Sequence, residues 1–323
     1  MNENKKNVPQ SPDDLFRFID SNSISSEKIV APRYSYWKSV FRVFFRKKIN
    51  IFMLVALALI LLVSFIMPSF WKYDPNENVT NAATFNLSPA KAMAYFHDGS
   101  LKWILGTGAL GNSIFYGIVA SARTSLLLAI ICAAINMSIG IVVGAVWGYS
   151  KKLDAIMLVI YNIIANVPYI LLISVLVYVI GSGFWPFVFA LTVTGWLGIA
   201  YFFRTQVMII RDREYSLASR CLGTPVRRVI SKNILPFLTS VIVTLLATEL
   251  PSYISMEVFL SYIGVGLSAT VPSLGRMIQQ GQTAFMTYPW AFWPPVAVAS
   301  AITIILYLLG QNLADASDPR THM

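Results

Sequence analysis

The chain has 323 residues, of which 56% are hydrophobic and 12% are charged, and its formal net charge is +10. Soluble domains are about 45–50% apolar and about 25% charged. The composition therefore excludes disordered, collagenous and disulfide-scaffold proteins, argues against a soluble enzyme and indicates an integral membrane protein.

The first 48 residues are mostly polar and are predicted to form an N-terminal region outside the membrane. Ser11-Pro12-Asp13-Asp14 has the capping residue, the early proline and the acidic first turn of a short helix. Further on, apolar residues at helical spacing alternate with basic ones: Trp37, Val40, Phe41, Phe44 and Phe45 with Lys38, Arg42, Arg46 and Lys47. This pattern predicts an amphipathic helix that anchors the chain among lipid headgroups, with a lipid-regulated switch as the alternative.

Six later stretches are apolar and approach or exceed the length of about 20 helical residues that crosses a bilayer. They are Ile49–Met67, Leu126–Trp147, Ala155–Ile180, Pro186–Phe203, Leu238–Val258 and Ala291–Gly310. The expected fold is therefore an all-α polytopic membrane protein with six transmembrane helices. The first stretch has no small-residue cleavage site after it and is expected to be an uncleaved anchor.

The basic residues indicate the orientation of the chain. Twenty of the 25 Lys and Arg residues fall in segments that share one side of the membrane if the chain crosses it six times. Because such residues favour the cytoplasmic side, both termini and the 204–237 loop are predicted to be cytoplasmic. The expected regions are a cytoplasmic start 1–48, a first helix 49–67, an extracellular segment 68–123, a five-helix core 124–310 and a cytoplasmic tail 311–323.

Two sets of residues inside the spans are candidates for packing or transport. Gly140, Gly144 and Gly148 lie four residues apart, which predicts a seam for close approach of another helix rather than a ligand site. Asn162 and Asn166 precede Pro168 in a polar stretch, for which lining a cavity and bonding a neighbouring helix are both open roles.

Two acids lie in the fifth span, where a carboxylate needs a polar partner or water. Glu257 lies close to the outer end, where exposure to water costs little, and is a candidate polar residue of a transport path or a subunit interface. Glu249 is nearer the middle and is expected to face either an aqueous transport path or a polar network with a partner subunit.

The sequence carries no recognisable catalytic motif. Its two histidines, His97 and His322, lie outside the spans, so no membrane-embedded zinc pair or histidine-based dyad is available. It also has no Gly-x-x-x-x-Gly-Lys-Ser/Thr loop for binding ATP. A non-catalytic chain is therefore expected.

The 204–237 loop holds seven basic residues. Its pattern predicts one helix from Thr205 to Leu222 that Gly223 ends, and a second that begins at Thr224-Pro225 and ends at Pro236. Small side chains around Ala218 are expected to leave a shallow notch. A loop of about 30 residues tethered at both ends is too short for an independent DNA-binding domain, which favours a docking surface for another protein.

This loop resembles the EAA loop of ABC importer permeases, which reads Glu-Ala-Ala-x-x-x-Gly and later a hydrophobic residue, Leu and Pro. Ala218, Gly223, Leu235 and Pro236 match, whereas Leu217 replaces the glutamate and Ser219 the second alanine. The resemblance implies docking to an ATPase through these positions and their neighbours: Glu214, Tyr215, Leu217, Ala218, Ser219, Arg220, Cys221, Leu222, Gly223, Thr224, Pro225, Leu235 and Pro236.

Further motifs are similar to those of the C-type permease subunit of oligopeptide and dipeptide importers. They are Leu105-Gly106-Thr107, Leu110-Gly111, Ala122-Arg123-x-Ser125-Leu126, Arg204-x-Gln206-Val207, Glu257, Ser261–Gly266, Pro272-Ser273-Leu274-Gly275 and Asp315-x-x-Asp318-Pro319-Arg320. Gly108, Asn112 and Ser113 stand where that family has charged residues. The resemblance covers about residues 33–320 and implies the fold of type I ABC importer permeases.

The family scheme implies several partners: a second, different permease subunit, two ATPase subunits that carry ATP and Mg, an extracellular substrate-binding protein and membrane lipid, but no nucleic acid. The chain itself is then expected to bind no metal or cofactor and to line half of a peptide pathway in the bacterial cytoplasmic membrane. Nickel complexes, glutathione or another small solute are alternative cargoes. A stand-alone channel or secondary transporter, or an intramembrane enzyme, remains the alternative outside the family.

Overall fold

The computed structural model describes residues 35–71, 73–75, 82–97 and 99–318. The chain divides into two compact units, Met1–Trp37 and Lys38–Met323. The described part of the first unit is residues 35–37, where α1 (Tyr36–Arg46) begins. The short helix predicted at Ser11–Asp14 lies outside the described residues, and everything reported below belongs to the second unit.

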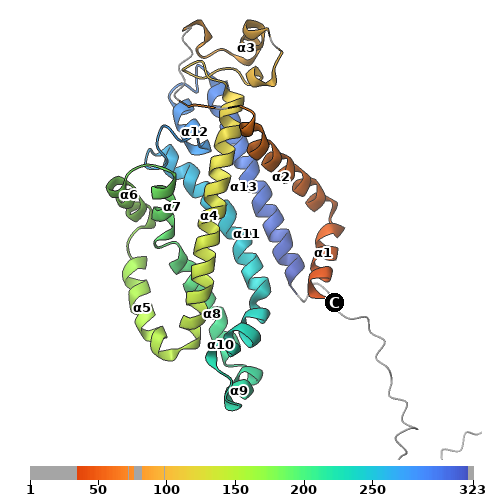
Figure 1. The fold of residues 1–323 in the computed structure, drawn as a ribbon, viewed down its shortest axis with the longest axis vertical. Coiled ribbons are helices and arrows are strands. Elements are labelled where there is room, and N and C mark those ends of the chain that lie inside the picture. The colour runs from red at the N-terminus through yellow and green to blue at the C-terminus, as the bar shows by residue number, and fades with distance from the viewer. Residues whose placement is uncertain (1–34, 72, 76–81, 98, 319–323) are drawn as a thin grey trace, which may run out of the picture. The chain divides into compact units, whose positions relative to one another are not determined.

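Helices form nearly all the regular structure of the described residues, beside one isolated bridge between Thr107 and Ser113 (Figure 1). After α1 they are α2 (Lys48–Ile66), α3 (Pro89–Phe96), α4 (Ile114–Tyr149), α5 (Lys151–Ala165), α6 (Tyr169–Ile180), α7 (Phe184–Thr192), α8 (Trp196–Arg211), α9 (Glu214–Cys221), α10 (Val226–Arg228), α11 (Thr239–Tyr262), α12 (Leu274–Gln282) and α13 (Pro289–Ser317). In Figure 1, α3 lies near one end of α4, whereas α9 and α10 lie near the other.

The described residues contain five helices that are long and apolar enough to cross a membrane: Lys48–Ser69, Ile114–Tyr149, Phe184–Arg211, Val226–Tyr262 and Pro289–Ser317. A sixth crossing is complete if α5 and α6, which bend by 77° at the break between them, count as one span. The predicted all-α, polytopic fold is therefore confirmed.

Two helices differ in extent from the predicted apolar stretches. α4 begins at Ile114, where the Ser113 hydroxyl accepts a hydrogen bond from the Tyr116 amide, so this helix starts before the predicted stretch Leu126–Trp147 and includes residues 114–123 of the predicted outer segment. Small and polar residues such as Ser121 and Ser125 lower the apolar signal there, although both are fully buried against neighbouring helices. The third span is not continuous either, because Pro168 favours an extended residue before it and α5 ends at Ala165.

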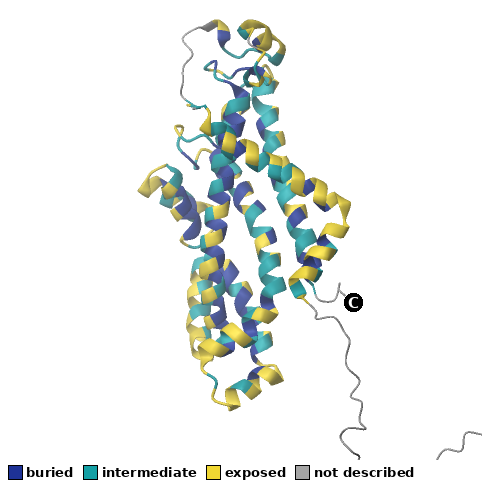
Figure 2. Ribbon diagram, turned by 45° about the vertical axis from the view of Figure 1, so that its right-hand side comes forward, coloured by how far each residue is buried: buried dark blue, intermediate teal, exposed yellow. Residues whose placement is uncertain are grey.

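The middle of the bundle is built around α4, which is apolar on all sides and packs on both α8 and α11. Figure 2 shows buried residues along the central helices and exposed ones along the peripheral helices. The larger buried cluster includes Leu128, Phe187, Ile254 and Ile302. A second cluster at the α9 end joins α4, α8 and the helical turns that lead into α11 through Ala145, Phe203, Val207, Val229, Ile234 and Leu238.

Candidate functional site

The 204–237 loop is supported by two closely packed helices, α4 and α8. A Cβ atom on Gly144 would lie 2.6 Å from the Ala200 carbonyl oxygen, and one on Gly148 would lie 2.6 Å from the Arg204 carbonyl oxygen. Gly140 abuts the same helix one turn earlier. The predicted glycine seam therefore lies where the two backbones approach closely, which favours movement of α4 and α8 as one body.

α8 ends at Arg211, and the continuous helix predicted over Thr205–Leu222 is wrong. The buried Arg211 guanidinium donates to the Gly148 carbonyl at 3.0 Å and makes two hydrogen bonds to the Asp212 carboxylate, at 2.9 and 3.0 Å. These bonds draw the chain back against the end of α4, so that it turns at Asp212 before α9 begins. The same hydrogen bonds from Arg211 lower the pKa of Asp212 below its usual value.

α9 ends at the predicted glycine. Gly223 has a φ of 74°, the left-handed conformation that favours glycine. Its amide donates to the Arg220 carbonyl at 2.9 Å, and the Thr224 amide donates to the Ser219 carbonyl at 3.1 Å. This is the Schellman pattern, which satisfies the last carbonyls of a helix and stops it sharply.

The second predicted helix begins near its expected place but does not end at Pro236. Pro225 is the N-cap residue of α10, after which the chain continues through a π-helical turn, Val229–Ile234, and a 3₁₀ turn, Leu235–Leu238, directly into α11. Pro236 lies at the start of the 3₁₀ turn, where its missing N–H leaves no bond unmade. The loop is therefore continuous with the next membrane-spanning helix.

The tip of the loop is apolar and exposed. Leu222 is 86% exposed, and Leu217 and Val226 are also exposed. Among the predicted docking residues, the exposed ones are Glu214, Tyr215, Leu217, Ala218, Arg220, Cys221, Leu222, Gly223, Pro225 and Pro236, and the half-buried ones are Ser219, Thr224 and Leu235. An exposed cluster of this kind, at the end of a basic loop, is typical of a contact surface for another protein.

The inner side of α9 is fastened to the chain that follows it. The Asn233 amide donates to the Ser219 hydroxyl at 2.6 Å, and the Tyr215 and Phe237 rings lie 5.1 Å apart. Arg220 donates to the Arg211 carbonyl at 3.1 Å. The two halves of the loop therefore form one rigid element.

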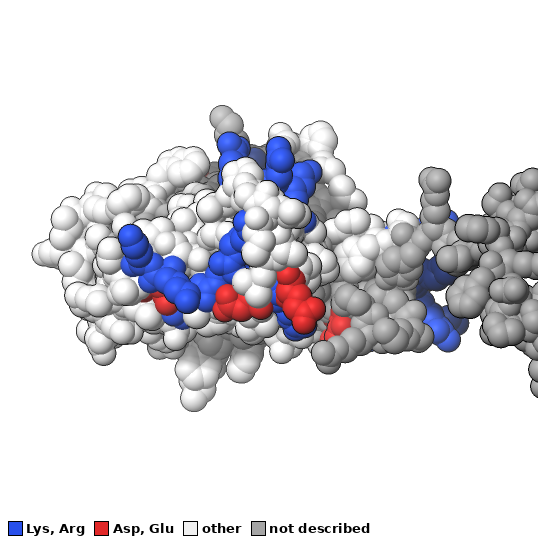
Figure 3. All heavy atoms as spheres, turned by 90° about the horizontal axis from the view of Figure 1, so that it is seen from below, with Lys and Arg blue, Asp and Glu red and all other residues white. Residues whose placement is uncertain are grey.

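Basic side chains surround this element. Figure 3, which views the molecule from the α9 end, shows Lys and Arg residues gathered over the surface with a few acids between them. The exposed basic residues of the loop are Arg213, Arg220, Arg227, Arg228 and Lys232, and the exposed Lys151 and Lys152 begin α5.

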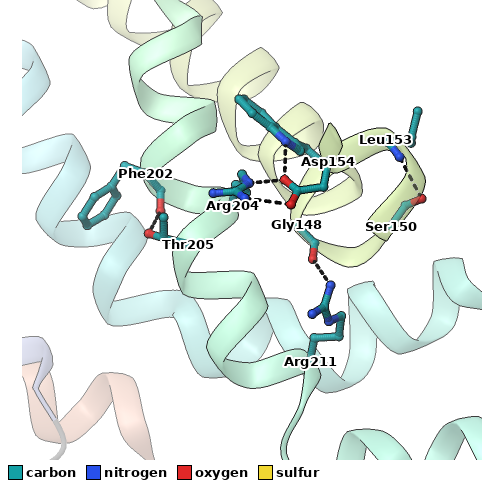
Figure 4. Close-up of polar contacts among 9 residues, drawn as sticks. Gly148, Ser150, Leu153, Asp154, Phe202, Arg204, Thr205 and Arg211 are labelled. Carbon is teal, nitrogen blue, oxygen red and sulfur yellow. Dashed lines mark hydrogen bonds and ion pairs between the residues drawn. The ribbon is translucent and has the colours of Figure 1, made fainter. Parts of the chain in front are cut away.

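An ion pair joins α5 to α8 above the loop (Figure 4). The Arg204 guanidinium binds both carboxylate oxygens of Asp154, one of them at 2.8 Å, and the Trp147 indole N–H donates to the same carboxylate at 2.8 Å. The Asp154 and Arg204 side chains are 20% and 10% exposed. Arg204 also lies over the Trp147 ring, 5.5 Å from its centroid.

This cluster was not predicted from the sequence. Asp154 and Arg204 lie 50 residues apart, and no sequence motif contains both of them. The predicted span ended at Phe203, which left Arg204 in the basic loop, whereas the structure places it within the span Phe184–Arg211, where an ionisable residue calls for a partner.

Asn162 and Asn166 are both exposed on α5. The Asn166 amide donates to the Asn162 carbonyl at 2.5 Å, so it caps the end of its own helix. Beside the break, a cavity of about 280 Å³ is lined by residues of α5, α6 and α8, but by neither asparagine. Both asparagines therefore lie on the exposed surface of the chain and not in this cavity.

Glu249 is half-buried and contacts the Tyr253 hydroxyl. Asn136 donates to that hydroxyl at 2.5 Å and to the Leu191 carbonyl at 3.3 Å. Glu249 therefore lies at the end of a polar network that joins α4, α7 and α11 within the chain itself.

Glu257, for which exposure to water at the outer end would cost little, is instead completely buried within the chain. The Ser125 hydroxyl donates to one of its carboxylate oxygens at 2.7 Å, and the Ser261 hydroxyl donates to the other at 2.9 Å. Ser273 and the Gly275 amide, at the start of α12, also bond to it. The non-helical segment between α11 and α12 folds back over the end of α11 and excludes water from the site.

Within the described residues, no group of three or more His, Cys, Asp and Glu side chains is arranged to hold a metal ion. Cys132 is buried and Cys221 is exposed, and both are free thiols.

Comparisons with known proteins identify the family. Residues 136–323 match the model of the binding-protein-dependent transport system inner membrane component, and residues 35–89 match the N-terminal TM domain of oligopeptide transport permease C. The chain is 46% identical to the oligopeptide transport system permease protein AmiD of Streptococcus pneumoniae over 95% of its own length and 97% of that protein. It is 32% identical to the oligopeptide transport system permease protein OppC of Bacillus subtilis, over 98% of its own length and 99% of that protein. It is 31% identical to the dipeptide permease protein DppC of the same species, over 96% and 94%.

These matches span the N-terminal helices and the whole core that carries the 204–237 loop. The chain therefore belongs to the binding-protein-dependent inner membrane components of ABC transporters, and within them to the oligopeptide and dipeptide permeases.

Proposed function

We propose that this chain is a permease subunit of an ATP-driven peptide importer, that it forms half of the transport pathway and that its 204–237 loop docks on a separate ATPase subunit. The observation that carries the proposal is the exposed apolar tip of α9 and α10, mounted on the packed α4–α8 pair. A coupling element needs a rigid support and an exposed end, and this loop has both.

The structure of the loop suits the transmission of force. The Schellman stop at Gly223 and the Asn233–Ser219 hydrogen bond keep its two halves together. Arg220 binds the Arg211 carbonyl at the end of α8, and Arg211 in turn binds the end of α4. Movement of a docked ATPase would therefore displace membrane-spanning helices rather than bend the loop, as rigid-body alternation of access requires.

The remaining partners follow from the same proposal. A second permease subunit and lipid would cover the exposed apolar residues of α6, which include Leu171 and Val175. An extracellular binding protein would deliver the peptide, and ATP and Mg would be bound by the ATPase subunits alone. The basic loop would face the cytoplasm, together with both termini, in the cytoplasmic membrane.

Replacing Ala218 with Trp tests the docking role. Ala218 is exposed on α9, so the larger side chain should block the ATPase without disturbing the core. We expect the complete importer to lose co-purification of its ATPase and its peptide uptake. Gly223→Trp should also cause loss of ATPase co-purification and of peptide uptake.

The control for Gly223→Trp is Gly99→Trp, because Gly99 also has a positive φ and open space around its Cβ position but lies in the outer segment. Wild-type co-purification and uptake in both loop variants would overturn the docking assignment.

The peptide assignment has its own test, in vesicles that contain the complete importer and its binding protein. ATP-dependent accumulation of a labelled oligopeptide is expected, and unlabelled peptides should compete with it. Accumulation of a nickel complex or glutathione in place of peptide would refute the peptide assignment while leaving the docking role intact.

A further inference from the structure

α5 is weakly attached to the rest of the bundle. None of its residues is buried, and apolar side chains such as Ile156 and Ile163 are exposed. Ser150 alone separates it from α4, and beyond its other end the chain bends by 77° into α6. Elements with few buried apolar contacts are those that move most readily.

Two side chains nevertheless connect α5 to α8. Asp154, in the first turn, forms the two-pronged ion pair with Arg204. Further along, the Tyr161 ring stacks on the Tyr201 ring, with centroids 4.3 Å apart. Because a guanidinium binds a carboxylate in one plane with two parallel bonds, the ion pair defines the position and the angle of α5 against α8.

Arg204 lies on the helix that carries the docking loop. About two turns further along α8, Arg211 holds the end of α4 through the Gly148 carbonyl. Arg220 of α9 donates to the carbonyl of the same Arg211. A contiguous series of hydrogen bonds and packed backbones therefore leads from α9 to Arg204, and the ion pair extends it to α5 (Figure 4).

We propose that Asp154 and Arg204 are positioning residues for transport: they hold α5 to the α4–α8 pair, so that displacement of the docking loop carries α5 with it. The inference rests on the proposed docking function and adds that α5 moves together with the loop. Without the ion pair, the loop and the ATPase would still engage, but α5 would not follow.

The first experiment measures peptide transported per ATP hydrolysed in vesicles that contain the complete importer. Asp154→Asn is expected to lower this ratio about tenfold, within the range typical of coupling between two sites, while the ATPase still co-purifies. Arg204→Lys keeps the charge but loses the two-pronged geometry, so an intermediate loss is expected. If the Asp154→Asn protein fails to accumulate in the membrane, peptide transported per ATP is measured for Arg204→Lys instead.

Two further variants make the test specific. The double variant Asp154→Asn with Arg204→Gln should be no worse than Asp154→Asn alone, because both changes break one interaction. Lys152→Gln is the matched control, since Lys152 is an exposed residue of the same helix turn, and it should transport normally. Additive losses in the double variant would show that the two residues act separately and would overturn the proposal.

The second experiment follows α5 directly. Ile163, 66% exposed, is replaced by Cys in a Cys221→Ser background, which leaves the buried Cys132 as the remaining thiol. The rate of labelling by a thiol reagent is compared between the nucleotide-free importer and the importer trapped with ATP. We expect the rate to differ between these states, and Asp154→Asn to remove the difference.

The outcomes separate this inference from the docking role. If Asp154→Asn retains normal transport per ATP, or retains the state-dependent labelling, the positioning role is refuted while docking stands. If Ala218→Trp leaves ATPase binding and uptake unchanged, the docking role fails, and the inference fails with it.

Discussion

Glu257 illustrates how a single carboxylate organises the end of the bundle opposite the docking loop. It accepts hydrogen bonds from Ser125 of α4 and Ser261 of α11, and the amide of Leu274 in α12 donates in turn to the Ser125 hydroxyl at 3.2 Å. Three helices therefore meet at one buried acceptor. A buried polar network of this kind stabilises the fold only while each of its members has a partner.

Removing this acceptor should destabilise the protein. In Glu257→Ala, buried hydroxyl donors lose their acceptor, and each such loss costs about 1–3 kcal/mol, so thermal unfolding of the purified importer is expected at a clearly lower temperature. Glu257→Gln keeps one acceptor oxygen and should have a smaller effect. Glu214→Ala, at an exposed position, is the control for unfolding. An unchanged unfolding temperature in Glu257→Ala would contradict the role given to the network.

At the scale of elements, the pairing of α4 with α8 decides how the loop is supported. Gly144 and Gly148 allow the α4 backbone to lie against carbonyl groups of α8, and Gly140 makes room for the Ile199 side chain. The α5–α8 ion pair and the loop contacts are then built on this pair. By contrast, α5 has no buried residue and depends on Asp154 and Tyr161 for its placement.

Widening this seam should therefore affect both stability and docking. In Gly144→Leu, the new Cβ would lie 2.6 Å from the Ala200 carbonyl oxygen and 3.0 Å from the Phe203 Cβ, so the helices must separate. Overpacking of this kind costs about 1–3 kcal/mol, and a lower unfolding temperature with weaker ATPase co-purification is expected. Gly198→Leu is the matched control, because a Cβ at Gly198 meets open space. Equal unfolding temperatures for the two variants would contradict a tight seam.

At the scale of the whole molecule, the docking loop and the outer segment belong to opposite ends of α4 (Figure 1). The loop carries exposed basic residues, and the six predicted crossings place it on the same side as both termini. Under the proposed function, one end of the bundle contacts the ATPase and the opposite end receives the peptide.

Thiol labelling tests this orientation. The native Cys221 is exposed in the loop, so a membrane-impermeant maleimide should label it in inside-out vesicles stripped of the ATPase subunits but not in intact cells. In a Cys221→Ser background, Gly99→Cys should show the reverse pattern, since Gly99 lies in the outer segment. Labelling of Cys221 in intact cells would invert the proposed topology.

Much of the fold and part of the candidate site follow from local sequence. Apolar runs of sufficient length predict the membrane-spanning helices, because a helix is the form in which an isolated segment satisfies its own backbone hydrogen bonds in lipid. The stop at Gly223 is equally local, since it depends on one residue that adopts a positive φ at low cost. The break of α8 at Asp212 was not predictable in the same way, because it depends on Arg211 reaching a carbonyl of α4.

By itself, the sequence determined the class of protein, the all-α polytopic fold and the basic loop with its glycine stop, since these depend on composition, length and neighbouring residues. Only the tertiary structure decided that Glu257 is sealed from water and that Asp154 pairs with Arg204. In both cases the partners come from residues far apart in the chain, 132 positions for Glu257 and Ser125 and 50 for the ion pair. The physical reason is that the helices packed around a charge determine its environment in a membrane protein. The residues next to that charge in the sequence do not identify these helices.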